Sequence, residues 1–294
     1  MKNYQEKNKT ALLPKRELKN FTESHDYENN GRFSGTRTMI QADPDFKMRD
    51  SRLVLFTGVK GGCGCSFVAN SVASYLAGIK NKNIVLFDGN VCRQDSRMIY
   101  NISGSLLRDF GDASGELEEM NVSMLKKVVI NFENSLNVIL PPLKFEKAIY
   151  DLSEGFLNFI DLLLEFYDMV IADLPQYYFF GNNVKFISLA DKIAVVSGAD
   201  RYSKLNLDVM MENLYCLELE SKTDILINKF NLKTAMAPAV LLNSKGHPVK
   251  MFISYDRDIE YFYNSRGPFG MFNYSLRTVK ALTDYSENLY DELF

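Results

Sequence analysis

A glycine-rich loop between a strand pattern and a helical pattern is the feature that most constrains this fold. An apolar run at 53–56 leads into the loop, a helical pattern at 66–76 leads out of it, and the loop carries Gly58, Gly61, Gly62 and Gly64. Glycines allow turns closed to other residues, so successive N–H groups can converge on an anion at the N-terminus of the helix. The combination therefore predicts a phosphate-binding loop.

This loop departs from the general phosphate-binding pattern at one position. The pattern ends in Gly-Lys-Ser/Thr, whereas this chain reads Gly64-Cys65-Ser66. Ser66 keeps a hydroxyl suited to hold Mg²⁺, but Cys65 cannot supply the cation that neutralises the β- and γ-phosphates. We therefore expect a site that holds a nucleotide and cleaves it poorly.

Beyond Arg52, predicted strands alternate with predicted helices. Uninterrupted apolar strands, such as the one at 193–196, suit a parallel sheet covered on both faces. Alternation of this kind predicts an α/β fold, a doubly wound and mostly parallel sheet with helices on both faces. The expected strands are 52–57, 83–88, 136–140, 169–173, 192–196, 224–228 and 249–253, and the clearest helices are 66–79, 154–166, 203–219 and 278–294.

Four motifs resemble those of the ParA/MinD class of dimeric P-loop ATPases, which have the SIMIBI-class P-loop NTPase fold. Residues 60–66 read Lys-Gly-Gly-Cys-Gly-Cys-Ser, similar to the deviant Walker A motif of that class. The strand that ends at Asp88 resembles the one carrying the switch I aspartate, and the strand that ends at Asp173 resembles Walker B. Asn228 matches the asparagine that reads adenine. The resemblance covers residues 51–294.

The resemblance implies a site for ATP or ADP with Mg²⁺. Lys60 matches the signature lysine that reaches across a dimer to the partner's nucleotide. The implied metal residues are Ser66, Asp88 and Asp173. The implied nucleotide-binding residues are Gly58, Lys60, Gly61, Gly62, Cys63, Gly64, Cys65, Ser66, Phe67 and Asn228.

A second departure concerns the attacking water. The class usually has Asp-x-Asp after its second strand, whereas this chain reads Asp88-Gly89-Asn90. A neutral amide can position a water but cannot accept its proton. The implied catalytic set of Lys60, Asp88 and Asn90 is therefore degenerate, and we expect turnover at or near background.

Within the class, two features most resemble the CpaE/TadZ branch, namely the missing loop lysine and the sequence Asp173-Leu174-Pro175. That branch implies an ATP-dependent homodimeric scaffold that localises or regulates assembly of an envelope machine, a pilus or a flagellum, together with a polar-landmark partner. The alternative is an active MinD/FlhG-like ATPase switch that controls placement or number.

Composition indicates a cytoplasmic protein without DNA as a partner. A net charge of −3 gives no general attraction to nucleic acid or to anionic lipid, and no apolar run reaches the length of a membrane helix. The polar face of the helix expected at 278–294 is acidic, which favours core packing over membrane insertion. Residues 1–50 are polar and mixed in charge, so we expect a disordered tail.

The cysteines leave one further alternative open. Cys63 and Cys65 lie in the phosphate loop, and Cys92 follows the strand that ends at Asp88. A disulfide that blocks the loop is therefore one alternative. Against it, position 63 needs only a small apolar residue, and free cysteine packs as one. Nothing else in the sequence suggests thiol chemistry.

Overall fold

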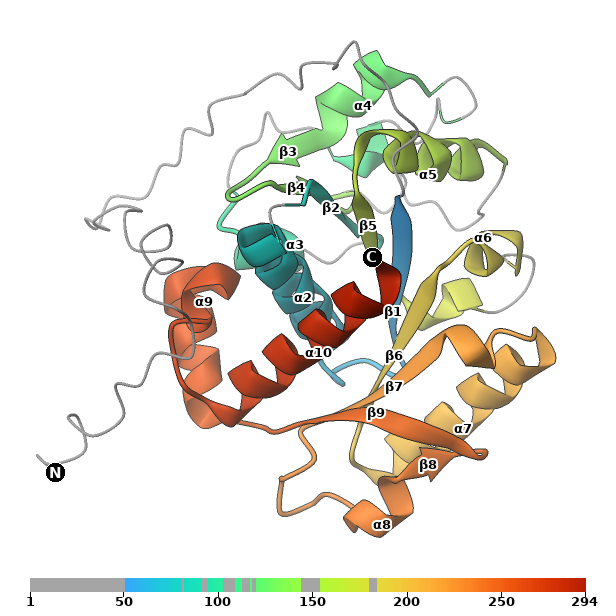
Figure 1. Cartoon of the computed structure of the whole chain (residues 1–294), viewed down its shortest axis with the longest axis vertical. Helices are drawn as coiled ribbons and strands as arrows, with labels where there is room; N and C mark the ends of the chain where they lie inside the picture. The colour runs from blue at the N-terminus through green and yellow to red at the C-terminus, as the bar shows by residue number, and fades with distance from the viewer. Residues whose placement is uncertain are drawn as a thin grey trace, which may run out of the picture.

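The computed structural model describes residues 51–80, 82–90, 95–102, 109–112, 117, 120–143, 154–179 and 184–294 (Figure 1). The polar segment 1–50 and Cys92 lie outside these residues. The strands are β1 (Arg52–Gly58), β2 (Ile84–Asp88), β3 (Val129–Asn131), β4 (Leu136–Ile139), β5 (Met169–Leu174), β6 (Lys192–Gly198), β7 (Thr223–Asn228), β8 (Asn243–Ser244) and β9 (His247–Ile253).

These strands form one sheet in the order β3-β4-β2-β5-β1-β6-β7-β9-β8. All neighbours pair in parallel except the two edges, where β3 runs antiparallel to β4 and β8 to β9. The predicted doubly wound, mostly parallel α/β sheet is thereby confirmed. In the register between β2 and β5, Asp88 lies beside Asp173, so the two predicted acidic residues meet at the carboxyl edge.

Helices cover both faces of the sheet (Figure 1). The longer ones are α2 (Cys65–Lys80), α5 (Glu154–Phe166), α7 (Arg201–Cys216), α9 (Arg257–Met271) and α10 (Arg277–Leu293). The shorter ones are α3 (Asp95–Ile99), α4 (Val122–Val128), α6 (Val184–Ser188) and α8 (Pro238–Leu241), with 3-10 turns η1 (Phe110–Asp112), η4 (Gln176–Phe179) and η6 (Glu220–Lys222).

Alternate residues of each central strand enter two separate cores. In β1, Leu53 and Leu55 pack with α5, α6 and α7, while Val54 and Phe56 pack with α2, α9 and α10. Because both faces of these strands are buried, apolar residues fill the middle of each strand, and polar residues such as Asp88 and Asn228 lie at strand ends. Leu282, Tyr285 and Leu289 of α10 are at most 1% exposed, which confirms core packing of that helix. None of the helices in the described parts of the chain is long and apolar enough to cross a bilayer.

The structure adds elements that the sequence patterns did not predict. β3 and β8 have three and two residues, too few for a periodic signal. Helix α9 is not among the helices expected from periodicity, because it contains Gly267 and Pro268, two helix-breaking signals. Gly267 has a φ of 67° and marks a kink inside this helix.

Candidate nucleotide-binding site

The loop between β1 and α2 forms an open cradle at the carboxyl edge of the sheet. Gly62 and Gly64 have φ values of 81° and 91°, in the left-handed region that favours glycine. At Gly64 a Cβ atom would lie 2.3 Å from Nδ2 of Asn228, so a side chain there would displace the Asn228 amide. The same Nδ2 donates to the Cys63 carbonyl at 2.9 Å, which ties the loop to the end of β7.

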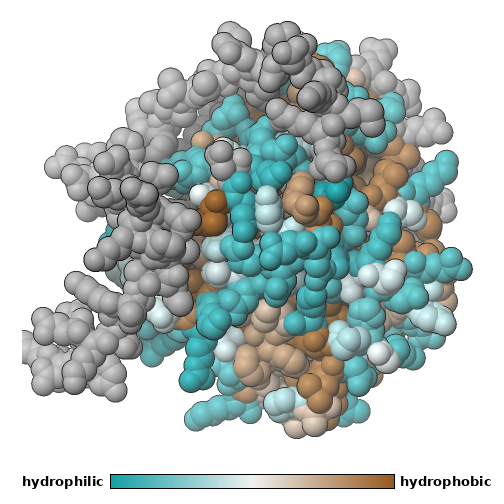
Figure 2. All heavy atoms as spheres, in the orientation of Figure 1, coloured by the Kyte–Doolittle hydropathy of each residue, from teal (hydrophilic) through white to brown (hydrophobic). Residues whose placement is uncertain are grey.

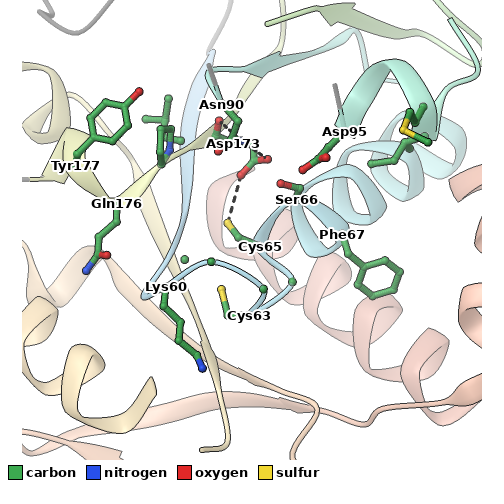
Figure 3. Close-up of a pocket in the computed structure, with 18 of the residues that line it drawn as sticks. Lys60, Cys63, Cys65, Ser66, Phe67, Asn90, Asp95, Asp173, Gln176 and Tyr177 are labelled. Carbon is green, nitrogen blue, oxygen red and sulfur yellow. Dashed lines mark hydrogen bonds between the residues drawn. The ribbon is translucent and has the colours of Figure 1, made fainter. Parts of the chain in front are cut away.

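A pocket of about 690 Å³ opens over this loop (Figure 3). Every loop residue predicted to bind nucleotide lines it, from Gly58 and Lys60 through Phe67. Asn228 instead lines a smaller neighbouring pocket of about 190 Å³. The larger pocket is completed by Asn90 and Asp173 and by residues that were not among the predicted site residues: Asp95, Met98, Ile99, Leu174, Pro175, Gln176, Tyr177 and Tyr263.

Asn90 bridges the two carboxylates behind the loop. Its Nδ2 donates to Asp173 Oδ2 at 2.7 Å and to Asp88 Oδ1 at 3.1 Å. Ser96 Oγ donates to Asp88 Oδ2 at 2.6 Å, and the Cys65 thiol donates to Asp173 Oδ1 at 3.3 Å (Figure 3). Each of the four carboxylate oxygens therefore accepts a hydrogen bond from an uncharged donor.

The two unusual residues of the sequence thus act on the same carboxylate. Cys65 occupies the position of the loop lysine, and Asn90 occupies the position of a second carboxylate, yet both donate to Asp173. No sequence pattern indicated this link. It became visible only when β1, β2 and β5 were placed side by side.

Burial controls the protonation of this cluster. It raises the pKa of Asp173 to about 7, with a further increase from the charge of Asp88. Burial likewise raises the pKa of Asp88, against hydrogen bonds from Ser96 and Asn90 that lower it. The pKa of the Cys65 thiol is well above its usual value through burial and the charge of Asp173, so the thiol stays protonated and is a weak nucleophile.

The donor set is compatible with a magnesium ion at part of the predicted site. The Ser66 and Asp173 side chains line the pocket, and hydroxyl and carboxylate oxygens are ligands that Mg²⁺ accepts. Asp88 is 0% exposed and does not line the pocket, so it is placed to orient Asn90 and Asp173. Its predicted part in holding Mg²⁺ stays a prediction.

Positive charge is scarce around the pocket. Among the described residues, the charged side chains that line it are Lys60, Asp95 and Asp173. The Lys60 ammonium lies 2.9 Å from Asp200 Oδ2, and both side chains are more than one-third exposed. The pocket therefore has one cation, and that cation already faces a carboxylate.

Asp200 anchors this ion pair at the start of α7. Its carboxylate accepts from the backbone N–H groups of Tyr202 and Ser203 as the N-cap of the helix. Burial raises the pKa of Asp200, but hydrogen bonds from Ser203 and Lys60 outweigh it and lower the pKa to about 2. Sequence reasoning missed Asp200, although its place just after β6 is a signal that could have found it.

The smaller pocket adjoins the larger one across Gly64, Phe67 and Tyr263, which line both. The Phe67 and Tyr263 rings meet edge-on with centroids 5.0 Å apart. Asn228 and Lys229 from the end of β7, and Glu260 and Asn264 from α9, line its other sides. The described cysteines Cys63, Cys65 and Cys216 are free, and a role for Cys92 lies outside the described residues.

Comparison with solved structures places this fold. A ParA family ATPase from Chlorobium tepidum superposes with a TM-score of 0.69 at 21% identity, covering 81% of this chain and 99% of that one. The fold is that of the ParA/MinD ATPases. MinD from Pyrococcus horikoshii, complexed with Mg-ADP, gives a TM-score of 0.65 at 14% identity, covering 81% of this chain and 96% of that one.

A third neighbour is a plasmid partition protein from Borrelia burgdorferi bound to AMPPNP, with a TM-score of 0.62 at 19% identity, covering 82% of this chain and 99% of that one. No family model and no curated protein matches the sequence. The ParA/MinD-type fold is therefore established through structure.

Proposed function

We propose that this chain binds ATP or ADP as a ParA/MinD-type protein. The observation that carries the proposal is the cradle itself, in which Gly62 and Gly64 turn the loop at the N-terminus of α2 above Asp173. Backbone N–H groups and the helix dipole bind phosphate without any side-chain cation. Loss of the loop lysine therefore weakens this binding and does not abolish it.

Each of the two pockets would hold one part of the nucleotide. The loop residues would hold the phosphates, and Ser66 with Asp173 would hold Mg²⁺, which supplies positive charge beside them. The smaller pocket, with Asn228 on its wall, has the size for a base. The shared Phe67 and Tyr263 would then flank the ribose.

Hydrolysis by this site should be weak or absent. Cys65 presents a protonated thiol where phosphoryl transfer needs a cation. The Asn90 amide is a donor to both Asp88 and Asp173, so it offers the attacking water no base. Nucleotide would then act as a structural ligand.

Lys60 supports a homodimer in the nucleotide-bound state. It is the one cationic side chain that lines the larger pocket within the described residues, and it lies at the exposed rim. Asp200 can release it at small cost, because an ion pair this exposed contributes little to stability. A second copy would then supply positive charge to this copy's nucleotide, as the resemblance to deviant Walker A proteins implies.

The finer role follows from the CpaE/TadZ resemblance alone. On that ground we propose a cytoplasmic scaffold that a polar-landmark partner recruits to the cell pole or the inner face of the membrane, where it localises or regulates assembly of a pilus or flagellum. The alternative is an active MinD/FlhG-like switch: the retained Lys60, Ser66 and Asp173 around one pocket suit both roles, whereas Cys65 and Asn90 favour the scaffold. Phosphate release by the purified protein separates the two.

Titration calorimetry with ADP and ATP in the presence of Mg²⁺ tests nucleotide binding directly. Gly64→Ala should abolish measurable binding, because its Cβ would clash with Asn228 Nδ2. Gly62→Ala is the matched control: it has a similar φ but open space around its Cβ, so its effect reports backbone strain alone. Absence of binding to the unmodified protein at millimolar ligand would refute the proposal.

A further inference from the structure

The segment from Lys229 to Lys250 has an unusual charge balance. It contains four of the 34 basic residues of the chain, Lys229, Lys233, Lys245 and Lys250, and none of the 37 acidic ones. The chain as a whole has a net charge of −3. The segment is therefore a local positive region on a negatively charged protein.

The middle of this segment exposes apolar side chains. Helix α8 and its flanks read Met236-Ala237-Pro238-Ala239-Val240-Leu241-Leu242, and among these Leu241 is the one buried residue. Val240 is 49% exposed and Leu242 is 55% exposed. Figure 2 shows apolar residues gathered at the lower end of the molecule, where Figure 1 places α8 and β9. We call Ala237, Pro238, Ala239, Val240 and Leu242, with Lys233 and Lys245, the α8 surface.

The lysines of the α8 surface remain available for an external partner. Lys233 is exposed, and the Lys245 ammonium lies 3.2 Å from Glu212, with both side chains more than half exposed. Such an exposed pair contributes little free energy and exchanges readily. Lys250 differs, because Glu292 of α10 binds it, and we do not count it in the α8 surface.

The backbone of the α8 surface is anchored to the fold, but its exposed side chains do not contribute to the core. The Met236 N–H donates to the Ala199 carbonyl and the Val249 N–H to the Leu242 carbonyl, both near 2.9 Å, so the backbone is fixed at both ends. Between these two bonds only Leu241 enters a core. The exposed residues can therefore be replaced without loss of the fold.

We propose that the α8 surface is a docking site for an anionic lipid surface. Exposed apolar side chains flanked by lysines, with no carboxylate in the segment, suit the headgroup layer of such a membrane: the apolar groups enter the boundary and the lysines bind the headgroups. The acidic polar face of α10 has the opposite character. Lysines beside exposed apolar side chains complement anionic headgroups better than they complement a purely apolar groove on another protein.

Vesicle sedimentation with the full chain tests this proposal. The protein should pellet with vesicles made of equal parts phosphatidylserine and phosphatidylcholine, and should stay in solution with phosphatidylcholine alone. Val240→Asp and Leu242→Asp should each lower the partition coefficient about tenfold, the value of one buried aliphatic side chain. Lys233→Glu should lower it about fivefold or more through lost attraction.

Two exposed sites supply matched controls. Leu189→Asp replaces an apolar residue that is 46% exposed beside α6, and Lys127→Glu reverses an exposed charge on α4; Figure 1 places both helices away from α8. Neither change should alter partition. Equal pelleting with neutral vesicles, or equal loss in the controls, would overturn the proposal. So would a Val240→Asp variant that loses self-association in sedimentation while vesicle binding is unchanged, because a second copy would then cover the surface.

Discussion

Two buried aspartates at opposite ends of the parallel strands have different surroundings. Asp173 lies at the carboxyl end of β5 and Asp224 at the start of β7, with exposed fractions of 1% and 6%. Asp224 lies 3.6 Å from the Lys192 ammonium and accepts from the Tyr285 hydroxyl at 3.2 Å. Asp173 accepts from Asn90 and Cys65, both uncharged.

The difference shows in the electrostatics of each site. Burial raises the pKa of Asp224, but the charges of Lys192 and Lys250 offset part of that rise. Burial and the neighbouring Asp88 both raise the pKa of Asp173, to about 7. Lysine charges thus compensate the carboxylate of Asp224, which ties α10 to the sheet. The carboxylate of Asp173, beneath the phosphate loop, has only uncharged donors around it among the described residues. A buried charge without a counterion costs stability, and such costs persist at binding sites.

Supplying the missing cation and base should give the largest effect. Cys65→Lys places an ammonium beside Asp173, and Asn90→Asp restores a carboxylate for the attacking water. We expect the double variant to raise ATP turnover at least 100-fold over the unmodified protein, and each single variant to raise it less, since both groups act on one transition state. Phosphate release measures this. Rapid hydrolysis by the unmodified protein, abolished by Asp173→Ala, would establish the active-switch alternative instead.

Removing the cation at the other end of the sheet should cost stability. Lys192→Met removes the nearest cation from Asp224 while Glu292 keeps Lys250, and Lys192 is only 14% exposed. We expect the free energy of unfolding to fall by about 3 kcal/mol, because one member of a buried pair is lost. Lys280→Met breaks an exposed pair with Asp284 and should change it by less than about 0.5 kcal/mol. Urea denaturation compares the two.

Neutralising Asp173 should raise the free energy of unfolding, whereas Lys192→Met should lower it. In the unfolded chain its carboxyl ionises near pH 3.8, whereas in the folded protein it stays protonated up to about pH 7. The folded state therefore binds the extra proton between these values, and its stability falls as pH rises from about 4 to 7. Asp173→Asn removes this slope and should stabilise the protein at pH 8 by on the order of 2 kcal/mol.

Melting temperatures measured from pH 4 to pH 8 test that expectation. Asp258→Asn, at an exposed position near the start of α9, is the control and should leave the pH profile unchanged. A profile for Asp173→Asn parallel to that of the unmodified protein would show that the Asp173 carboxylate is compensated by some other group.

The smallest effect on stability is expected at Lys60. Its pair with Asp200 is more than one-third exposed on both sides, so Lys60→Ala should change the free energy of unfolding by less than about 0.5 kcal/mol. The nucleotide-dependent dimer should nevertheless become less populated. Analytical ultracentrifugation with and without ATP measures the dimer, and an unaltered profile would exclude a role for Lys60 across the interface.

The fold was largely predictable from local patterns, and the site only in part. All seven predicted strands exist within about two residues of their expected bounds, because buried parallel strands leave uninterrupted apolar runs. The glycine loop was equally predictable, because the left-handed backbone at Gly62 and Gly64 favours glycine. Predictions of what each residue binds remain to be tested by the experiments above.

The sequence alone determined seven of the strands, the helices α2, α5, α7 and α10 and the place of the phosphate loop, because these depend on periodicity, glycine and strand-end position within short stretches of chain. Only the tertiary structure decided that Asn90 bridges Asp88 and Asp173, that Cys65 donates to Asp173, and that Asp200 holds Lys60. Asn90 and Asp173 are 83 residues apart. A hydrogen bond depends on distance in space, and strands that are distant in the chain become neighbours only when the sheet forms.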